Sequence, residues 1–320
     1  MNSFLIVQWR IILKLIFLVE NFLLTISLLV IGMLLKRLPI FPDNTSQTLN
    51  LFVIYVSLPA LVLLKVPELT FSYEILVAAI TPWGLLIFSA GLIVIAAKIF
   101  NWNRDVLAAL LLIVPLGNTS FLGIPMVQSF FGEQAVPYAL IYDQLGSFLA
   151  LAVYGSLILA LFSQKKDKVT IKSVLVKIIT FPPFISLVIA LMLANMSLSQ
   201  SYFDFLSPIA STLVPVVMIA VGFQLNLRLE PGQLQPFIIG LSVKMLIAPA
   251  LIFWLFFMFG LNGMIYKVTV FEAAMPPMIS AGALAIMVNL APKLTAAMIA
   301  YGIVFSFVTL PILFYTLSLI

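Results

Sequence analysis

The sequence predicts an all-α integral membrane protein of ten transmembrane helices in two inverted halves. Hydrophobic residues make up 63% of the chain and charged residues only 8%, whereas soluble domains carry roughly 25% charged residues. The apolar stretches continue for about 20 residues and lack the alternation of a membrane β-strand. Because lipid offers no hydrogen bonds to the backbone, such stretches must be helices.

Ten apolar runs separated by polar breaks are the candidate spans. They cover about 20–38, 46–65, 73–99, 105–131, 134–162, 172–196, 203–227, 234–260, 264–290 and 294–318. Lysine and arginine are concentrated in the odd-numbered loops, whereas the opposite side carries only Lys65 and Lys267 besides the N-terminal segment. The positive-inside rule therefore predicts cytoplasmic odd loops, with both termini outside the cytoplasm of a multi-pass protein of the cell (plasma or inner) membrane.

The chain divides at its one clearly hydrophilic stretch. Residues 20–162 form a first predicted five-helix repeat, 163–171 a basic cytoplasmic linker, and 172–320 a second five-helix repeat. Because five is odd, the second repeat must be inserted upside down relative to the first. Residues 1–19 are too short for a confident span, and we expect an interfacial segment or an extension of the first helix.

The composition also narrows the chemistry. The absence of cysteine and histidine removes disulfides, thiolate metal sites and the usual general base. No phosphate-binding loop or dinucleotide-binding turn is found. We therefore expect neither an enzyme, a metal site nor a cofactor, and the net charge of +5 reflects membrane topology rather than nucleic-acid binding.

Two of the predicted spans are interrupted by proline and glycine. Proline removes a backbone donor and clashes with the preceding turn, and glycine adds freedom. At 1.5 Å per residue, Asn118 lies about 21 Å from Arg104, and Pro276 lies about 14 Å from Lys267. Both breaks therefore fall near the bilayer midplane. The residues expected to shape them are Pro115, Gly123, Pro125 and Gly282.

Broken backbone at this depth persists only when it is buried in protein or lines a cavity. Half-helix N-termini attract anions, and polar side chains beside them add donors and acceptors. Kinks that only shape packing are the alternative, but matched breaks in inverted halves favour a transport site. The expected substrate-binding residues are Gly117, Asn118, Thr119, Ser120, Pro276, Pro277 and Ser280.

Charged residues within the spans are candidates for coupling or charge balance. Asp143, beside Gln144, is either a coupling or gating carboxylate or makes a structural hydrogen bond to the broken backbone of span four. Lys244 either balances a substrate carboxylate or an internal acid, or extends its amine to the interface. Glu272 is expected in an outer vestibule. Coupling to H⁺ would need a carboxylate, and Asp143 is the first candidate. The same carboxylate could equally hold Na⁺ together with backbone carbonyls.

Motifs in both broken spans resemble a known family. The run from Gly117 to Pro125 is similar to the plant pattern Pro-Asn-Thr-Leu-Val-Met-Gly-Ile-Pro, and Ala273 to Pro276 is similar to Ala-Ala-Leu-Pro. Further matches fall in order in spans two, seven and eight: Asn50 with Pro59, Met218 to Gly222, and Val243-Lys244. Over nearly all of the chain after about residue 20, the sequence resembles the auxin efflux carrier family of PIN-type carriers and bacterial organic-acid permeases.

The resemblance implies two inverted five-helix repeats, with broken helices four and nine crossing, and elevator motion against a scaffold of spans one, two, six and seven. It also implies that Asn118 contacts a substrate carboxylate and that the protein is a homodimer. Ala281 stands where the plant crossover has a proline, and Pro277 where it has glutamine. The linker is also short. These departures favour a carrier of another small organic anion over auxin itself.

Three functions follow in order of expectation. The first is secondary transport of a small organic anion, auxin-like or another carboxylate. The second is Na⁺-coupled symport of the bile-acid carrier type. The third is a non-transporting membrane sensor or assembly protein.

Overall fold

The computed structural model is all-helical over the residues that it describes, which are 23–69, 73–162, 170–194, 196, 198–225, 227, 229–230 and 232–319. Six helices in this part of the chain are long and apolar enough to cross a membrane, and a bent pair makes a seventh. The predicted all-α membrane class is confirmed at this level. The N-terminal segment 1–19 and most of the basic linker lie outside the described residues.

The six long helices agree closely with predicted spans. Two are single helices, α4 (Ile75–Phe100) and α17 (Pro292–Ser318). Each of the other four consists of several consecutive helical segments. They cover Thr45–Glu68, Glu133–Phe162, Gln200–Gln224 and Leu234–Met258. The first consists of α2 (Thr45–Phe52), η1 (Val53–Ser57), α3 (Leu58–Lys65) and η2 (Val66–Glu68), and the second of η4 (Glu133–Ala135), α7 (Val136–Ile141), η5 (Tyr142–Phe148), η6 (Leu151–Gly155) and α8 (Ser156–Phe162). The third consists of α11 (Gln200–Ser211) and α12 (Leu213–Gln224), and the fourth of α13 (Leu234–Ser242), η7 (Val243–Ile247) and α14 (Ala248–Met258).

The remaining predicted spans are shorter or divided. The first is represented by the helix Leu23–Leu35, and the sixth by α9 (Ile171–Ile179) and α10 (Pro182–Leu193), which meet at 64°. Span four is split into α5 (Arg104–Ile113) and the continuous η3 (Thr119–Gly123) and α6 (Ile124–Phe131). Span nine is split into α15 (Met264–Ala273) and α16 (Ile279–Met287).

Three π-helical segments precede a proline at one constant spacing. η1 precedes Pro59, η3 precedes Pro125, and η7 precedes Pro249. A proline offers no N–H to the carbonyl four residues earlier, and its ring clashes with that carbonyl, so the preceding turn widens while the helix continues. Helix α4 accommodates Pro82 without such a segment.

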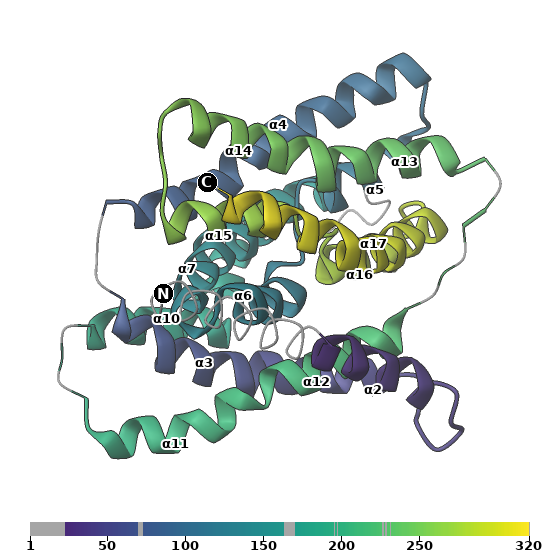
Figure 1. The fold of residues 1–320 in the computed structure, drawn as a ribbon. Coiled ribbons are helices and arrows are strands. Elements are labelled where there is room, and N and C mark those ends of the chain that lie inside the picture. The colour runs from purple at the N-terminus through teal and green to yellow at the C-terminus, as the bar shows by residue number, and fades with distance from the viewer. Residues whose placement is uncertain are drawn as a thin grey trace, which may run out of the picture.

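The helices form layers (Figure 1). α2, α3, α11 and α12 run along one side of the molecule, and α4, α13 and α14 along the opposite side. α10 and α11 pack against α3, and α12 packs against α2. α5, α6, α7, α15, α16 and α17 lie between these two layers, so the segments on either side of both breaks occupy the middle of the fold.

Close helix packing joins the helix Leu23–Leu35 to α12. A Cβ atom on Gly32 would overlap the carbonyl oxygen of Ile219, and one on Gly222 would overlap the carbonyl oxygen of Leu29. Each helix therefore presents a glycine to the backbone of the other. Small residues allow this approach, and van der Waals contact then holds helices together where lipid gives no hydrophobic driving force between them.

Aromatic side chains hold α6 against α15 and α17. Phe130 and Phe131, at the end of α6, pack against Phe271 of α15 and Phe314 of α17, with ring centroids 5.0–5.4 Å apart. Tilted and edge-on aromatic pairs at this separation are favourable. This cluster holds the end of α6 against the last turn of α15, next to the second break.

Candidate functional site

The two non-helical breaks are short and lie in predicted spans four and nine. Regular helix stops at Ile113 and resumes at Thr119, and it stops again at Ala273 and resumes at Ile279. Pro115 lies inside the first break, and Pro276 and Pro277 lie inside the second, where consecutive prolines remove two backbone donors. Both breaks therefore lie within predicted spans four and nine.

Three residues expected to shape the breaks lie in helical backbone instead. Gly123 ends η3, Pro125 lies in the first turn of α6, and Gly282 lies inside α16. The π-turn before Pro125 relieves the clash of its ring, so the helix widens there and does not break. Gly282 serves packing, because a Cβ atom on it would overlap the Ile299 side chain of α17.

The two breaks meet each other through their backbones. Asn118 N donates to Pro276 O at 2.8 Å, and Met278 N donates to Leu116 O at 2.9 Å, which makes an antiparallel bridge between Gly117 and Pro277. Asn118 is only 2% exposed. The bridge satisfies polar backbone groups that neither helix can satisfy alone, as burial in the membrane requires. The name crossing is used below for Leu116–Asn118 together with Pro276–Met278.

Asp143 binds the start of η3 through side chains. Thr119 Oγ1 donates to its Oδ1 at 2.6 Å, Ser120 Oγ donates to the same oxygen, and Gln144 Nε2 donates to Oδ2 at 2.6 Å. The carboxylate is fully buried in η5. Hydrogen bonds to an ionised acceptor are the strong ones. Asp143 thus ties span five to the broken helix through side-chain hydroxyls, whereas the structural role considered from the sequence was a hydrogen bond to the broken backbone.

Lys244 extends toward the crossing. Its side chain is 4% exposed, and Nζ donates to Ala273 O at 3.3 Å, at the C-terminal end of α15. Nζ would lie 3.0 Å from a Cβ atom on Gly117. A cation at the negative end of a helix dipole is stabilised. The amine therefore faces the first break and the last carbonyl of α15, in contrast to the alternative in which it reaches the interface.

Glu272 also lies elsewhere than its sequence position suggested. It was expected in an outer vestibule, but it is fully buried, and a Cβ atom on Gly123 would overlap its carboxylate. Neither carboxylate oxygen has a hydrogen-bond partner among the described residues. Glu272 interacts electrostatically with both Asp143 and Lys244. Two carboxylates and one amine therefore surround the crossing.

Further polar atoms at the crossing are also unsatisfied within the described part of the chain, namely Asn118 Nδ2 and Gln144 Oε1. Ser280 is half-buried in the first turn of α16. A cavity of only about 10 Å³, lined by Gly117, Tyr142 and Lys244 among others, adjoins the first break. Its size corresponds to about one water molecule. The crossing is therefore tightly packed, with unmatched donors and acceptors inside it.

Comparison with known proteins decides the family. A protein-family model described as "Membrane transport protein" matches residues 17–314. The chain belongs to this family. It is the auxin efflux carrier family that the motifs of spans four and nine resemble, and its members are multi-pass membrane transporters. Because members of this family are transporters, the alternative of a non-transporting sensor is set aside.

The similarity to two archaeal relatives covers most of each chain. An uncharacterized transporter of Methanocaldococcus jannaschii is 27% identical over 295 residues, covering 89% of this chain and 94% of its own. An uncharacterized transporter of Methanothermobacter thermautotrophicus is 23% identical over 296 residues, covering 92% and 96% respectively. The similarity thus spans both predicted repeats in this carrier family.

Proposed function

We propose that this auxin efflux carrier family member is a secondary transporter of a small organic anion and that the crossing binds the anion's carboxylate. The observation that carries the proposal is Asn118. Its amide nitrogen is buried and has no acceptor among the described residues. A buried donor without a partner costs about 1–3 kcal/mol. A bound carboxylate would supply the acceptor.

The surroundings of Asn118 favour an anion over a neutral solute. Helical backbone begins at Thr119 and at Ile279, directly after the two breaks, and N-terminal N–H groups attract negative charge. Lys244 adds a cation on the side of Gly117. Thr119 and Ser120 already donate to Asp143, so in this proposal they position the broken helix while Asn118 contacts the anion.

Transport follows an elevator-type alternating-access mechanism in this proposal. The chain would form ten helices in two inverted repeats, and the predicted scaffold of spans one, two, six and seven would remain fixed. Packing of α10 and α11 on α3, and of α12 on α2, supports such a scaffold. The protein would act as a homodimer in the cell membrane with both termini outside the cytoplasm. It would need no cofactor beyond a possible coupling H⁺ or Na⁺.

Glu272 favours a second candidate, cation-coupled symport of the bile-acid carrier type. A buried ionised carboxylate without hydrogen bonds is strongly unfavourable. Binding of Na⁺ or H⁺ would remove the isolated negative charge beside Gly123. In this second candidate Glu272, rather than Asp143, is the coupling residue. Replacing Na⁺ with K⁺ at fixed pH tests this candidate in its Na⁺-coupled form, because Na⁺ symport stops whereas anion transport that is not coupled to Na⁺ does not respond.

The main proposal is tested by uptake of labelled organic acids into proteoliposomes. Asn118→Ala is expected to lower anion uptake about ten- to 100-fold, the effect of one hydrogen bond to a charged group. The matched control is Asn44→Ala, because Asn44 is exposed and its side chain makes no helix-capping bond. Wild-type uptake by a folded Asn118→Ala protein would refute the assignment of the site.

A further inference from the structure

A second, larger cavity lies away from the crossing. It has a volume of about 580 Å³, and none of the crossing residues line it. Its walls come from the helix Leu23–Leu35, the end of α3, the end of α6 and the region where α11 meets α12. Most of the lining is apolar, with side chains such as Leu28, Leu61 and Val214. The space is sufficient for a small organic molecule.

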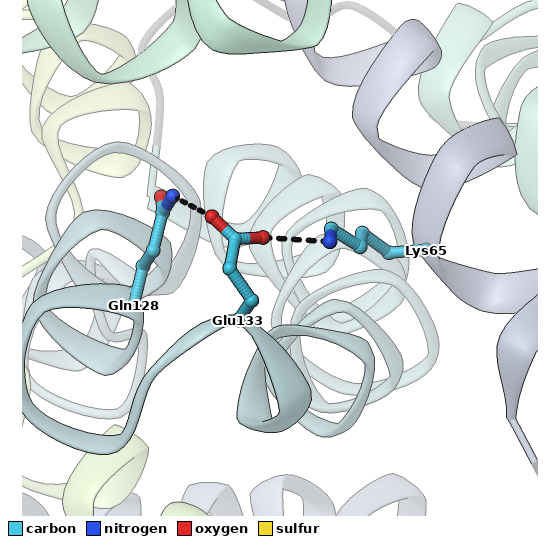
Figure 2. A network of polar contacts seen from close by, with 3 residues as sticks. All are labelled: Lys65, Gln128 and Glu133. Atoms are coloured by element: carbon cyan, nitrogen blue, oxygen red, sulfur yellow. Dashed lines mark hydrogen bonds and ion pairs between the residues drawn. The ribbon is translucent and has the colours of Figure 1, made fainter. Parts of the chain in front are cut away.

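One ion pair supplies the charges of this cavity. Lys65 Nζ lies 2.7 Å from Glu133 Oε2, and Gln128 Nε2 donates to Glu133 Oε1 (Figure 2). Lys65 ends α3, Gln128 lies in α6, and Glu133 begins η4. Among the described residues that line the cavity, Lys65 is the one cation and Glu133 the one anion.

The two partners differ in exposure, which decides which one can leave. The Lys65 side chain is 16% exposed, whereas that of Glu133 is 55% exposed. An exposed carboxylate regains water readily, but a largely buried amine needs a replacement anion. Exposed ion pairs also contribute little to stability. A second carboxylate can therefore replace Glu133 on Lys65, while Gln128 keeps its hydrogen bond to the displaced side chain.

We propose that this cavity is a second binding site for the transported class of small organic anion, with Lys65 as its recognition residue and Glu133 as the carboxylate that the anion displaces. The proposal rests on the proposed function for the identity of its ligand. The apolar walls accommodate the hydrocarbon part of the anion, and the ammonium of Lys65 takes its carboxylate.

The position of the cavity suits a site where the anion binds before it reaches the crossing. α6 continues from η3 directly after the first break, and Gln128 lies about 15 Å along this helix from Asn118 at 1.5 Å per residue. Lys65 belongs to the side of the membrane that is poor in lysine and arginine, which the sequence predicts to be outside. A carboxylate bound at Lys65 would therefore lie on the outer side of the crossing.

The test uses binding to the purified full-length protein, measured by calorimetry with phenylacetate and with phenylacetamide as the uncharged isostere. Lys65→Gln is expected to weaken phenylacetate binding about tenfold, the loss of one charge-assisted hydrogen bond. Glu133→Gln is expected to strengthen binding several-fold, because it removes the competing carboxylate. Phenylacetamide binding should change with neither substitution.

Matched controls come from the ion pair between Lys293 and Glu230. Both of these side chains are exposed, and neither residue lines the cavity. Lys293→Gln and Glu230→Gln should leave phenylacetate binding unchanged. If the Lys65–Glu133 pair were only a structural link, its two single variants would change binding in the same direction or not at all, and the proposal would be refuted. It would also be refuted if phenylacetate bound the wild type and Glu133→Gln no better than phenylacetamide.

A lipid phosphate could use the same lysine, so the measurement is repeated in nanodiscs of phosphatidylcholine and of phosphatidylglycerol. Equal phenylacetate affinity in both supports the free organic anion, whereas its loss in phosphatidylglycerol assigns the site to lipid and overturns the proposal. The Asn118→Ala variant separates this inference from the proposed function. It should lose uptake but keep the difference in binding between wild type and Lys65→Gln.

Discussion

Asp143 offers the sharpest test of how the broken helix is held, because asparagine and alanine there should behave differently. In Asp143→Asn the remaining carbonyl oxygen can still accept from Thr119 and Ser120. The new amide nitrogen faces Gln144, whose Oε1 has no partner among the described residues. A flip of the Gln144 amide therefore restores the third hydrogen bond. Only charge assistance is lost, about 1–3 kcal/mol in total.

Asp143→Ala removes every acceptor at once. Thr119 and Gln144 are fully buried, whereas Ser120 is partly exposed and can reach water. Two buried donors left without partners cost about 1–3 kcal/mol each, or roughly 2–6 kcal/mol together. This is a large part of a typical folding free energy of about 5–15 kcal/mol. We therefore expect Asp143→Asn to remain folded and Asp143→Ala to be severely destabilised.

The measurement is thermal unfolding of the detergent-purified variants, followed by size-exclusion chromatography of the heated samples. Equal stability of the asparagine and alanine variants would show that the three donors have other partners and would refute this account of Asp143. The folded Asp143→Asn protein also separates the two roles considered from the sequence. A structural carboxylate predicts that the pH dependence of uptake survives, and a proton-coupling carboxylate predicts that it disappears.

Three further predictions concern close contacts and charge at the crossing and scaffold. Gly123→Ala should destabilise the protein by about 1–3 kcal/mol, because the new methyl group overlaps Glu272, and thermal unfolding should show partial recovery when Glu272→Ala is added. Gly222→Ala should destabilise by at least a similar amount through backbone overlap, whereas Gly91→Ala, with open space around it, should be neutral or slightly stabilising in the same assay. Lys244→Met should keep the fold but lower anion uptake about tenfold; uptake equal to the wild type would exclude a role in anion binding.

Much of the fold could be predicted because lipid imposes simple rules on sequence. The predicted span at 134–162 differs by one residue from the helix Glu133–Phe162. The breaks at Pro115 and at Pro276-Pro277 were predicted because proline removes backbone donors wherever it occurs. Their similar depth followed from the helical rise alone. Hydrogen-bonded contact between them could only be implied by family resemblance, because depth does not determine lateral position in the bilayer.

The errors have equally physical causes. Glu272 was assigned to a vestibule because it precedes the break, but it lies one helical turn before Pro276 and hence near the same depth. That spacing was available in the sequence and would have placed it correctly. Gly282 was predicted to shape a break because glycine both loosens helices and permits close packing, and sequence alone does not distinguish these effects. The Lys65–Glu133 pair joins spans two and five, whose adjacency has no local signal.

The bridge between Gly117 and Pro277 has a mechanical consequence. Its two backbone hydrogen bonds are buried, and each donor or acceptor left buried without a partner costs about 1–3 kcal/mol. Separating the two breaks without replacing these bonds would leave two donors and two acceptors unsatisfied, at a cost of roughly 4–12 kcal/mol, so fewer than about one molecule in a thousand would be in that state. The bridge therefore holds the two breaks in a fixed position relative to each other. In the proposed elevator motion, the four half-helices that it joins would therefore move together, and sliding would take place at surfaces where side chains alone are in contact.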